Sequence, residues 1–400
     1  MQYRTMPNGD SLSVLGFGCM RFPMQDGKID EARAIRQIRS AIDRGVNYLD
    51  TAWPYHGGES EIIVGKALKD GYRDKVKLAT KLPSWLIESP ADLDRFLDAQ
   101  LKKLGTDRID YYLVHALDGN SWDKMVGHGV AEFLDRAKAD GRIVNAGFSF
   151  HGLAPDFKRI VDGYPWVFCQ IQLNYLDQQF QAGTEGLYYA AERGLGVIVM
   201  EPLRGGNLGL PVPPAAVQAI WDEAGLRRTP VDWALSWVLN HPEVTLLLSG
   251  MNEEAHIEEN LAIAERALPG CLSAEELALV ERVGETYQGL MKVSCTGCGY
   301  CMPCPVGVDI PGSFDCFNKS HMFGNVQEAR FIYALRMSNE LLRSTPAYAS
   351  NCISCGACLE KCPQQIRIPE LLAEVAAELE GPWMKDLVAA GKQLFQKRPE

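Results

Sequence analysis

Residues 46–55 read Val-Asn-Tyr-Leu-Asp-Thr-Ala-Trp-Pro-Tyr, an apolar run that becomes polar at its end. Its first part, 46–51, has the length and composition of a buried strand and follows Gly45, a residue type that commonly ends a helix. Similar segments recur between about residues 10 and 265, each followed by a stretch of helical length. The predicted strands are 14–18, 46–51, 76–81, 109–115, 143–149, 167–173, 196–202 and 244–249. Eight successive βα units predict an α/β fold, a closed (β/α)8 barrel of the TIM type.

The periodicity changes after Gly284, where cysteines become frequent. We therefore predict a barrel domain at 1–285 and a smaller, mainly helical domain at 286–400, with helices at 325–343 and 369–379. The Gly- and Pro-rich segment 208–214 is expected to be an irregular surface loop. A chain of 400 residues, 46% of them hydrophobic, is long enough for one large core and a second, smaller one.

The chain is acidic, with 51 Asp and Glu against 40 Lys and Arg and a net charge of −11. This charge argues against a nucleic-acid or anionic-membrane partner, because both would repel it. No stretch reaches the roughly 18 apolar residues of a membrane span, and no basic cluster with an apolar run opens the sequence. We expect a cytoplasmic protein, in which twelve cysteines serve as metal ligands rather than disulfides.

Eight of the cysteines form two runs, CTGCGYCMPCP and CISCGACLEKCP. The runs contain Cys295, Cys298, Cys301 and Cys304, and Cys352, Cys355, Cys358 and Cys362. The second run has the Cx2Cx2Cx3CP spacing of bacterial ferredoxins, in which the fourth cysteine ligates the other of two clusters. The C-terminal domain thus resembles a two-cluster ferredoxin with a helical insert at 317–351, and two [4Fe–4S] clusters are expected.

This resemblance implies a crossed set of ligands. One cluster would be held by Cys295, Cys298, Cys301 and Cys362, and the other by Cys352, Cys355, Cys358 and Cys304. The first run departs from the ferredoxin pattern before its last cysteine, which leaves Cys316 as a possible substitute for Cys304. Two structural zinc sites are the alternative reading, since C-x2-C pairs also bind zinc. Cys19, Cys169 and Cys271 are isolated and are expected to be core residues.

Polar residues end three successive predicted strands: Asp50, Lys81 and His115, with Tyr55 just beyond the first. In a parallel barrel such residues meet at the mouth, where active sites are built. The motifs DTAWPY, LATK and YYLVH that contain them resemble those of the aldo/keto reductase family, and the resemblance extends over the whole first domain.

The residue types suit reduction of a small-molecule carbonyl, or oxidation of the alcohol. Tyr55 would act as the acid or base, with Lys81 lowering its phenol pKa, Asp50 orienting Lys81, and His115 donating to the substrate oxygen. Trp53 and Trp85 are either walls of the substrate pocket or ordinary packing residues.

The same resemblance implies a nicotinamide cofactor, NADH or NADPH, bound across the mouth. The matching positions are Ser149, Gln170, Leu203, Arg204, Ser249, Gly250 and Asn260. Arg204 is a candidate for the pyrophosphate or simply a solvated side chain. Phe150 and Met200 stand where the family usually has Asn and a stacking aromatic ring. Glutamates but no Lys or Arg lie between residues 248 and 260, which favours NADH over NADPH, or a different cofactor entirely, because a 2′-phosphate needs a cation.

A cluster moves one electron at a time, whereas a nicotinamide moves a hydride. A bound flavin would connect the two, although no flavin motif is visible, and the clusters could otherwise be structural. We therefore expect an oxidoreductase of the aldo/keto reductase type whose clusters exchange electrons with a ferredoxin-like partner. The alternative is an electron-transfer or redox-sensing module whose barrel is a non-catalytic binding scaffold.

Overall fold

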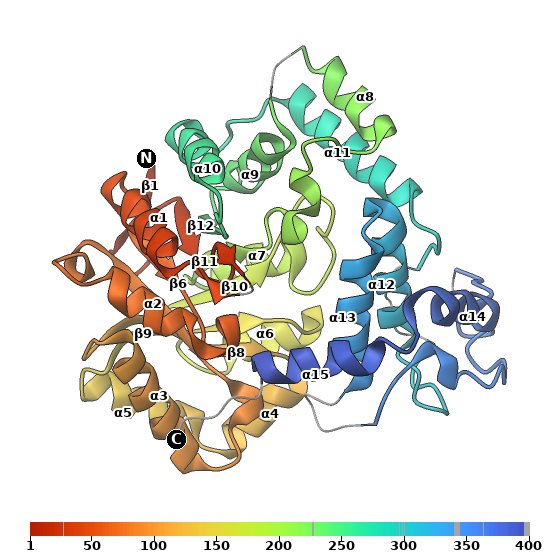
Figure 1. Cartoon of the computed structure of the whole chain (residues 1–400), viewed down its shortest axis with the longest axis horizontal. Coiled ribbons are helices and arrows are strands. Elements are labelled where there is room, and N and C mark those ends of the chain that lie inside the picture. The colour runs from red at the N-terminus through yellow and green to blue at the C-terminus, as the bar shows by residue number, and fades with distance from the viewer. Residues whose placement is uncertain are drawn as a thin grey trace. The chain divides into compact units, whose positions relative to one another are not determined.

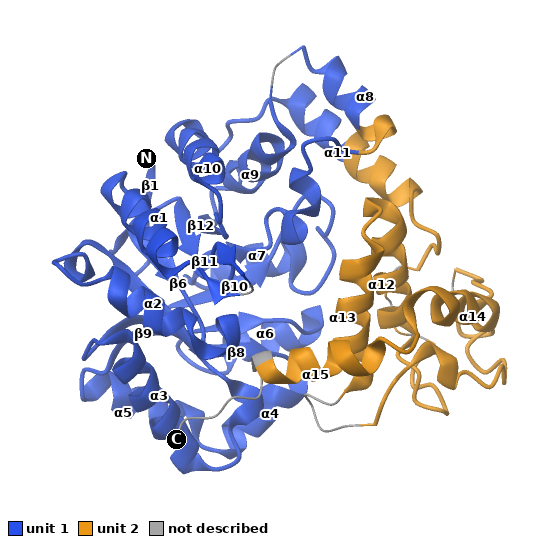
Figure 2. Cartoon of the chain, viewed as in Figure 1, with its two compact units in different colours: residues 1–213, 218–281, 397–400 blue, residues 214–217, 282–396 orange. Residues whose placement is uncertain are grey.

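A computed structural model describes residues 1–395 except 27, 226–227, 296, 298, 300, 340–344 and 363. The chain forms two compact units, one of residues 1–213 and 218–281 and one of 214–217 and the described residues between 282 and 395 (Figure 2). The predicted boundary near 285 falls inside helix α11 (Ala274–Gly289), which contributes residues to both units. Within the described residues, no helix combines the length and apolar character needed to cross a membrane.

The first unit is the expected barrel, closed by eight parallel strands in the order β10-β11-β12-β3-β6-β7-β8-β9 (Figure 1). The strands are β3 Leu15–Gly18, β6 Tyr48–Asp50, β7 Lys77–Leu82, β8 Ile109–Leu117, β9 Ile143–Phe150, β10 Phe168–Gln172, β11 Gly196–Met200 and β12 Val244–Ser249. All eight predicted strands are confirmed, and each ends within two residues of its predicted limits.

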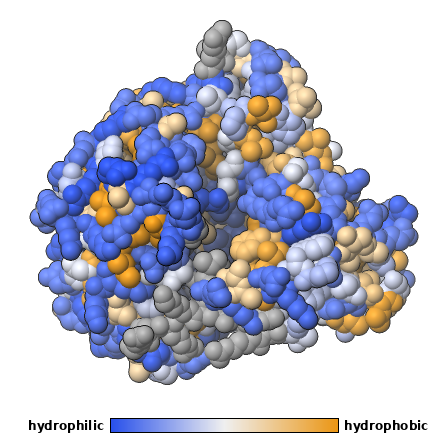
Figure 3. All heavy atoms as spheres, in the orientation of Figure 1, coloured by the Kyte–Doolittle hydropathy of each residue, from blue (hydrophilic) through white to orange (hydrophobic). Residues whose placement is uncertain are grey.

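Helices follow the strands and cover the barrel. They are α1 Glu31–Asp43, α2 Ser60–Ala67, α3 Pro90–Leu104, α4 Gly119–Gly127, α5 Val130–Ala139, α6 Ala154–Asp162, α7 Gly183–Glu192, α8 Ala215–Glu223, α9 Pro230–Asn240 and α10 Glu254–Arg266. Asp30 caps α1 by accepting from the backbone N–H of Arg33, and Ser89 and Asp92 form a capping box at α3. Exposed polar residues of these helices give the surface seen in Figure 3 its mainly hydrophilic character. The loop predicted at 208–214 is irregular except where the 3-10 turn η4 (Arg204–Gly209) reaches its first two residues.

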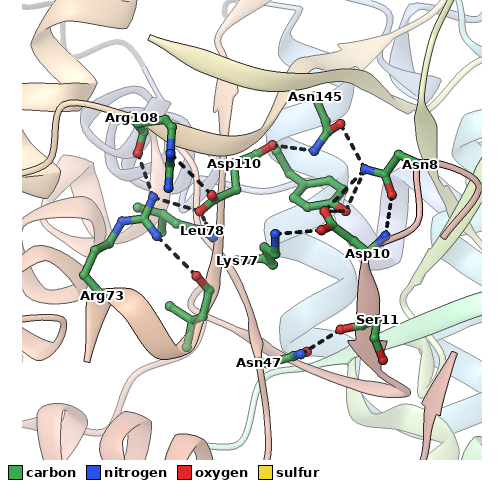
Figure 4. Close-up of polar contacts among 12 residues, drawn as sticks. Asn8, Asp10, Ser11, Asn47, Arg73, Lys77, Leu78, Arg108, Asp110 and Asn145 are labelled. Atoms are coloured by element: carbon green, nitrogen blue, oxygen red, sulfur yellow. Dashed lines mark hydrogen bonds and ion pairs between the residues drawn. The ribbon is translucent and has the colours of Figure 1, made fainter. Parts of the chain in front are cut away.

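A short hairpin of β1 (Tyr3–Thr5) and β2 (Ser11–Ser13) lies at the N-terminal ends of the barrel strands, opposite the mouth. Asp10 connects this hairpin to the barrel: its Oδ1 accepts from Lys77 Nζ at 2.7 Å, and its Oδ2 accepts from Tyr111 Oη at 2.7 Å. Asn8 continues the network to Asn145 Oδ1 at 3.0 Å (Figure 4). The apolar interior above it contains Met6, Leu12, Tyr48, Ala79, Tyr111, Leu113, Phe168, Ile198, Leu246 and Leu248.

The second unit is helical, as predicted, and has its own core. Its helices are α12 Ile310–Phe323, α13 Val326–Ser338, α14 Ile368–Leu379 and α15 Met384–Phe395, with a 3-10 turn η5 at Ala349–Asn351. α13 and α14 were predicted, and α12 and α15 were not. α13 ends at Ser338, where Asn339 caps it with a left-handed backbone, so its predicted continuation to 343, a residue outside the described ones, is wrong. Buried residues such as Phe314, Tyr333 and Leu372 form the core between the helices.

We predict that Asp10→Asn lowers the stability of the barrel by about 1 kcal/mol at neutral pH, because it weakens a partly buried ion pair and its hydrogen bonds. Burial alone would raise the pKa of Asp10, but hydrogen bonds from Lys77 and Tyr111 and the charge of Lys77 lower it. The wild-type advantage should therefore be complete above about pH 4, the pKa of an unfolded Asp, and disappear as pH falls through the lower folded value. Thermal unfolding of wild type and Asp10→Asn at neutral pH and at a pH well below 4 measures this difference in stability.

The matched control is Asp70→Asn, which removes an exposed carboxylate paired with Arg39. It should change the melting temperature much less than Asp10→Asn. Equal melting temperatures for wild type and Asp10→Asn at neutral pH would contradict the proposed contribution.

Candidate active site and metal centres

The four residues expected at the barrel mouth are brought together. Asp50 ends β6, Lys81 lies in β7 and His115 in β8, while Tyr55 begins the 3-10 turn η1 (Tyr55–Gly58) that follows β6. Lys81 is fully buried, and its Nζ donates to Asp50 Oδ1 at 2.5 Å, to the carbonyl oxygen of Thr51 at 2.9 Å and to Tyr55 Oη at 3.2 Å. The Tyr55 and His115 rings meet edge to face, with 6.1 Å between their centres.

The electrostatics of this group differ in one respect from the expectation. Burial opposes the charge of Lys81, but Asp50 and Tyr55 outweigh it and raise the Lys81 pKa, so the ammonium persists. Burial raises the pKa of Tyr55 above its usual value near 10, and the lowering by Lys81 only partly offsets this. The expected net lowering of the phenol pKa is therefore wrong. Burial and Lys81 hold the pKa of His115 well below its usual range, so its imidazole is neutral at pH 7.

His115 is held by the backbone around it. The next residue, Ala116, has a left-handed φ of +54°, and the pairing of β8 with β9 is irregular between Val114 and Leu117. The Ala116 N–H donates to Ser149 Oγ at 2.8 Å, and Ser84 Oγ donates to the His115 carbonyl oxygen at 2.7 Å. These two bonds stabilise the strained turn that presents His115 at the mouth.

The two tryptophans have different environments. Trp53 is buried, packs edge to face on Phe96 at 4.9 Å between ring centres, and has Lys103 Nζ 3.5 Å above its ring. It is thus a packing residue behind the site. Trp85 is half-buried, and its ring centre lies 5.1 Å from that of His115, so it stands beside the candidate site.

The residues expected to hold a nicotinamide amide already have partners. Ser149 Oγ accepts from Ala116, and Gln170 Nε2 donates to Asp50 Oδ2 at 2.9 Å. The serine hydroxyl retains its own proton, and the Oε1 atom of Gln170 takes no part in its bond to Asp50. A carboxamide needs one hydrogen-bond donor for its oxygen and one acceptor for its NH2 group. The Ser149 hydroxyl can be the donor and Gln170 Oε1 the acceptor. Phe150 is buried against Phe157, with ring centres 5.1 Å apart.

The other predicted cofactor contacts are also located. Arg204 is 11% exposed and its Nε donates to Asp177 at 2.9 Å, so the interpretation as a solvated side chain is wrong. Leu203 and Met200 are half-buried in and after β11. Asn260 Nδ2 donates to Ser249 Oγ at 2.8 Å, which brings that predicted pair together. At Gly250 an added Cβ would lie 3.3 Å from the side chain of Arg21, a cation that sequence reasoning did not connect with this strand end.

Cations lie near the glutamates after β12, contrary to the expectation from the local sequence. Arg33 of α1 donates to Glu253 at 2.6 Å and also to Glu254, and it lowers the pKa of Glu254 to about 2. Arg44 pairs with Glu258. Because these arginines come from a helix more than 200 residues away in the chain, a scan of 248–260 could not find them. Local charge therefore does not decide between NADH and NADPH.

In the second unit, the described cysteines of the two runs surround two cavities. The first cavity is lined by Cys301, Cys304, Cys352, Cys355 and Cys358. The second is lined by Cys295, Cys301 and Cys362. Cys298 lies outside the described residues. The fourth cysteine of each run thus lines the cavity of the other run, as in the crossed arrangement that the ferredoxin resemblance implies.

The donor set fits polynuclear clusters. Among the described residues, no three His, Cys, Asp or Glu side chains converge as ligands of a single metal ion. Each cavity is instead lined by cysteines of both runs, as expected for a two-cluster ferredoxin. Burial and the neighbouring Cys352, Cys355 and Cys304 raise the pKa of Cys358.

The proposed substitute ligand, Cys316, does not reach either cavity. It is fully buried in the core of the second unit on α12, where burial raises its pKa to about 12. Cys19 and Cys169 are buried in the barrel as expected, and Cys271 is half-buried.

Comparison with known proteins agrees with this geometry. A family profile described as the aldo/keto reductase family matches residues 14–210, and a profile described as a 4Fe-4S dicluster domain matches residues 294–366. L-galactose dehydrogenase of Arabidopsis thaliana is 28% identical over 72% of this chain and 96% of its own length. Pyridoxine 4-dehydrogenase of Escherichia coli is 27% identical over 70% and 96%.

Solved structures give the same fold. The holo form of an aldo-keto reductase from Bacillus halodurans superposes with a TM-score of 0.61 at 27% identity, covering 71% of this chain and 96% of the other. An aldo-keto reductase from Klebsiella pneumoniae in complex with NADPH gives a TM-score of 0.57 at 23% identity, covering 71% and 95%. The chain therefore carries an aldo/keto reductase domain, matched over residues 14–210, followed by a 4Fe-4S dicluster domain, matched over residues 294–366.

Proposed function

We propose that the barrel interconverts a small-molecule carbonyl and its alcohol, with Tyr55 as the acid or base. The contact of Lys81 Nζ with Tyr55 Oη at 3.2 Å, backed by Asp50, is the observation that carries this proposal. A scaffold that only bound another protein would not need a buried ammonium aimed at a phenol. The intact group therefore favours catalysis over the scaffold alternative.

Reduction adds a hydride to the carbonyl carbon and a proton to its oxygen. NADH or NADPH supplies the hydride when bound, and Ser149 and Gln170 would hold its carboxamide. Tyr55 is protonated at pH 7 and donates the proton, while Lys81 stabilises the phenolate that remains. The neutral His115 donates a hydrogen bond to the oxygen as negative charge develops on it.

We further propose that the second unit holds two [4Fe–4S] clusters that exchange single electrons with a ferredoxin-like protein. The cysteine-lined cavities and the match to a dicluster domain support this proposal. A hydride carries two electrons and each cluster one, so one turnover of the barrel corresponds to two cluster electrons. A flavin remains a candidate for pairing them, with no residue in the barrel mouth that singles it out.

Tyr55→Phe should abolish carbonyl reduction, with a loss of at least about 10²-fold, because the proton donor is gone while the pocket keeps its shape. Steady-state assays with a panel of aldehydes and ketones, and with NADH or NADPH, measure the loss. Tyr72→Phe is the control, since Tyr72 bonds to Asp43 on the outside of the barrel. Wild-type turnover in Tyr55→Phe would sink the mechanism.

The rate of carbonyl reduction should show no inflection from Tyr55 or His115 between about pH 7 and pH 9. Because the pKa of Tyr55 is raised, the phenol loses its proton only above about pH 10. Carbonyl reduction loses its proton donor over the same range. Oxidation of the alcohol needs the phenolate and should accelerate over the same alkaline range. Initial rates in both directions across pH test this, and a loss of reduction centred near pH 8 would contradict it.

Cys355→Ser should remove one cluster and leave the barrel folded, because Cys355 lines only the first cavity. Iron and sulfide analysis after anaerobic purification should fall from about eight to about four irons per chain. Cys316→Ala is the control and should keep all its iron, since Cys316 lines neither cavity. Full iron content in Cys355→Ser would overturn the assigned ligands.

A further inference from the structure

A second polar network lies behind the active site, between the barrel and its helices. Its centre is Glu61 in the first turn of α2, a carboxylate with no exposed surface. Glu61 Oε1 accepts from Thr80 Oγ1 and from Gln100 Nε2, each at 2.7 Å. Its Oε2 accepts from Lys103 Nζ at 3.2 Å. Both carboxylate oxygens are thus bound by side chains of β7 and α3.

Gln100 extends the network to the strand that carries the active-site lysine. Its Nε2 also donates to the carbonyl oxygen of Lys81 at 3.0 Å, and its Oε1 accepts from the hydroxyl of Tyr112 at 2.9 Å. Gln100 and Tyr112 are both fully buried. Through the Gln100 amide, Glu61 is connected to the backbone of Lys81 in β7 and to β8, the strand that carries His115.

Lys103 extends the network to the segment that carries the tyrosine. Its ammonium lies between the Glu61 carboxylate and the Trp53 ring, 3.5 Å from the ring centre. Trp53 stands two residues before Tyr55, in the turn after β6. Ser60, the residue before Glu61 in α2, holds the segment after β6 as well. Its hydroxyl donates to the carbonyl oxygen of Cys19 and is hydrogen-bonded to Thr51 Oγ1, each at 2.8 Å.

Apolar residues would fill this space at lower cost. A buried carboxylate loses several kcal/mol of hydration, and one partly exposed lysine returns only part of it. Unlike an apolar side chain, the carboxylate of Glu61 accepts three hydrogen bonds in fixed geometry. These bonds hold three elements in place relative to one another. The elements joined in this way are α2, β7 and α3. β7 carries Lys81, α2 follows the turn that begins with Tyr55, and α3 bonds through Gln100 to Tyr112 of β8, the strand that carries His115.

We propose that Glu61 is a positioning residue that holds the Lys81 strand and the Tyr55 turn at the separation needed for the Lys81–Tyr55 contact. The inference rests on the proposed carbonyl chemistry but concerns residues that touch no substrate. Glu61 acts on Lys81 through Gln100 and on Tyr55 through Lys103 and Trp53.

The test compares Glu61→Gln with wild type. The substituted amide keeps the volume but offers an NH2 group where a donor now binds, so one of the three hydrogen bonds is lost. The Lys81–Tyr55 contact should lengthen, so Lys81 should lower the pKa of the Tyr55 phenol less than it does in the wild type. Tyr55 should therefore ionise at higher pH. We expect kcat for reduction to fall about tenfold or more with KM within about twofold.

Ionisation of Tyr55 is measured without turnover, by ¹⁹F NMR of protein labelled with 3-fluorotyrosine, with Tyr55→Phe used to assign the resonance. The titratable groups around Tyr55 are Asp50, Lys81, His115 and Cys19, and the variant alters none of them. Glu31→Gln is the matched control. Glu31, in α1, forms a surface ion pair with Lys66, which lies in α2, the helix that also contains Glu61. This control should leave both kcat and the Tyr55 titration unchanged.

An unchanged or lowered Tyr55 titration in Glu61→Gln would overturn the inference, even if the melting temperature falls. Should Glu61→Gln not fold, Tyr112→Phe carries the test, since it removes one bond to Gln100 and should shift the titration in the same direction by less. The proposed function fails separately, if Tyr55→Phe retains turnover. The two failures are therefore distinguishable.

Discussion

The ion pair between Asp50 and Lys81 is the interaction on which the candidate active site depends. Both side chains are almost completely buried, at 4% and 0% exposed, so neither charge is stable there without the other. Removing one partner of such a pair typically costs about 3–5 kcal/mol. The pair also spans two neighbouring strands, and it forms only because β6 and β7 are held in register with Asp50 opposite Ala79. Gln170 reaches Asp50 from β10 and braces it from another side of the barrel.

The second unit meets an analogous problem of like charges. Five cysteines line the first cavity, and as thiolates they would repel one another, while burial raises the pKa of Cys358. A bound cluster would supply the positive charge that offsets this repulsion, which would couple its insertion to the local fold. The barrel thus compensates a buried charge with a second side chain, and the cysteine domain would compensate closely spaced thiolates with metal.

Much of this arrangement could be predicted from the sequence. The eight strands follow from short apolar runs, and the group at the mouth follows because parallel strands end at one face. Contacts between elements distant in the chain could not be predicted. Arg33 beside Glu253 and Gln170 on Asp50 are of this kind. The direction of the Tyr55 pKa also depended on burial, which the motif does not report.

Other features escaped because their local signals are ambiguous. Cys316 follows the first cysteine run at a plausible distance, yet helix α12 directs it into the core. Trp53 lies within the active-site motif but packs behind it on Phe96. The strands of the N-terminal hairpin are three residues long, too short for a periodic pattern to appear.

That hairpin and the Asp10 network lie at the closed end of the barrel, the full length of the strands away from Tyr55 and its partners. Rigidity and reactivity are thus assigned to opposite faces of one domain. An engineer could tighten the closed end for heat resistance while the loops of the mouth are varied to accept new substrates. Because the bonds described for Asp10 reach none of the four residues at the mouth, changes at the two faces should combine additively, and the usual conflict between stability and activity should be weak.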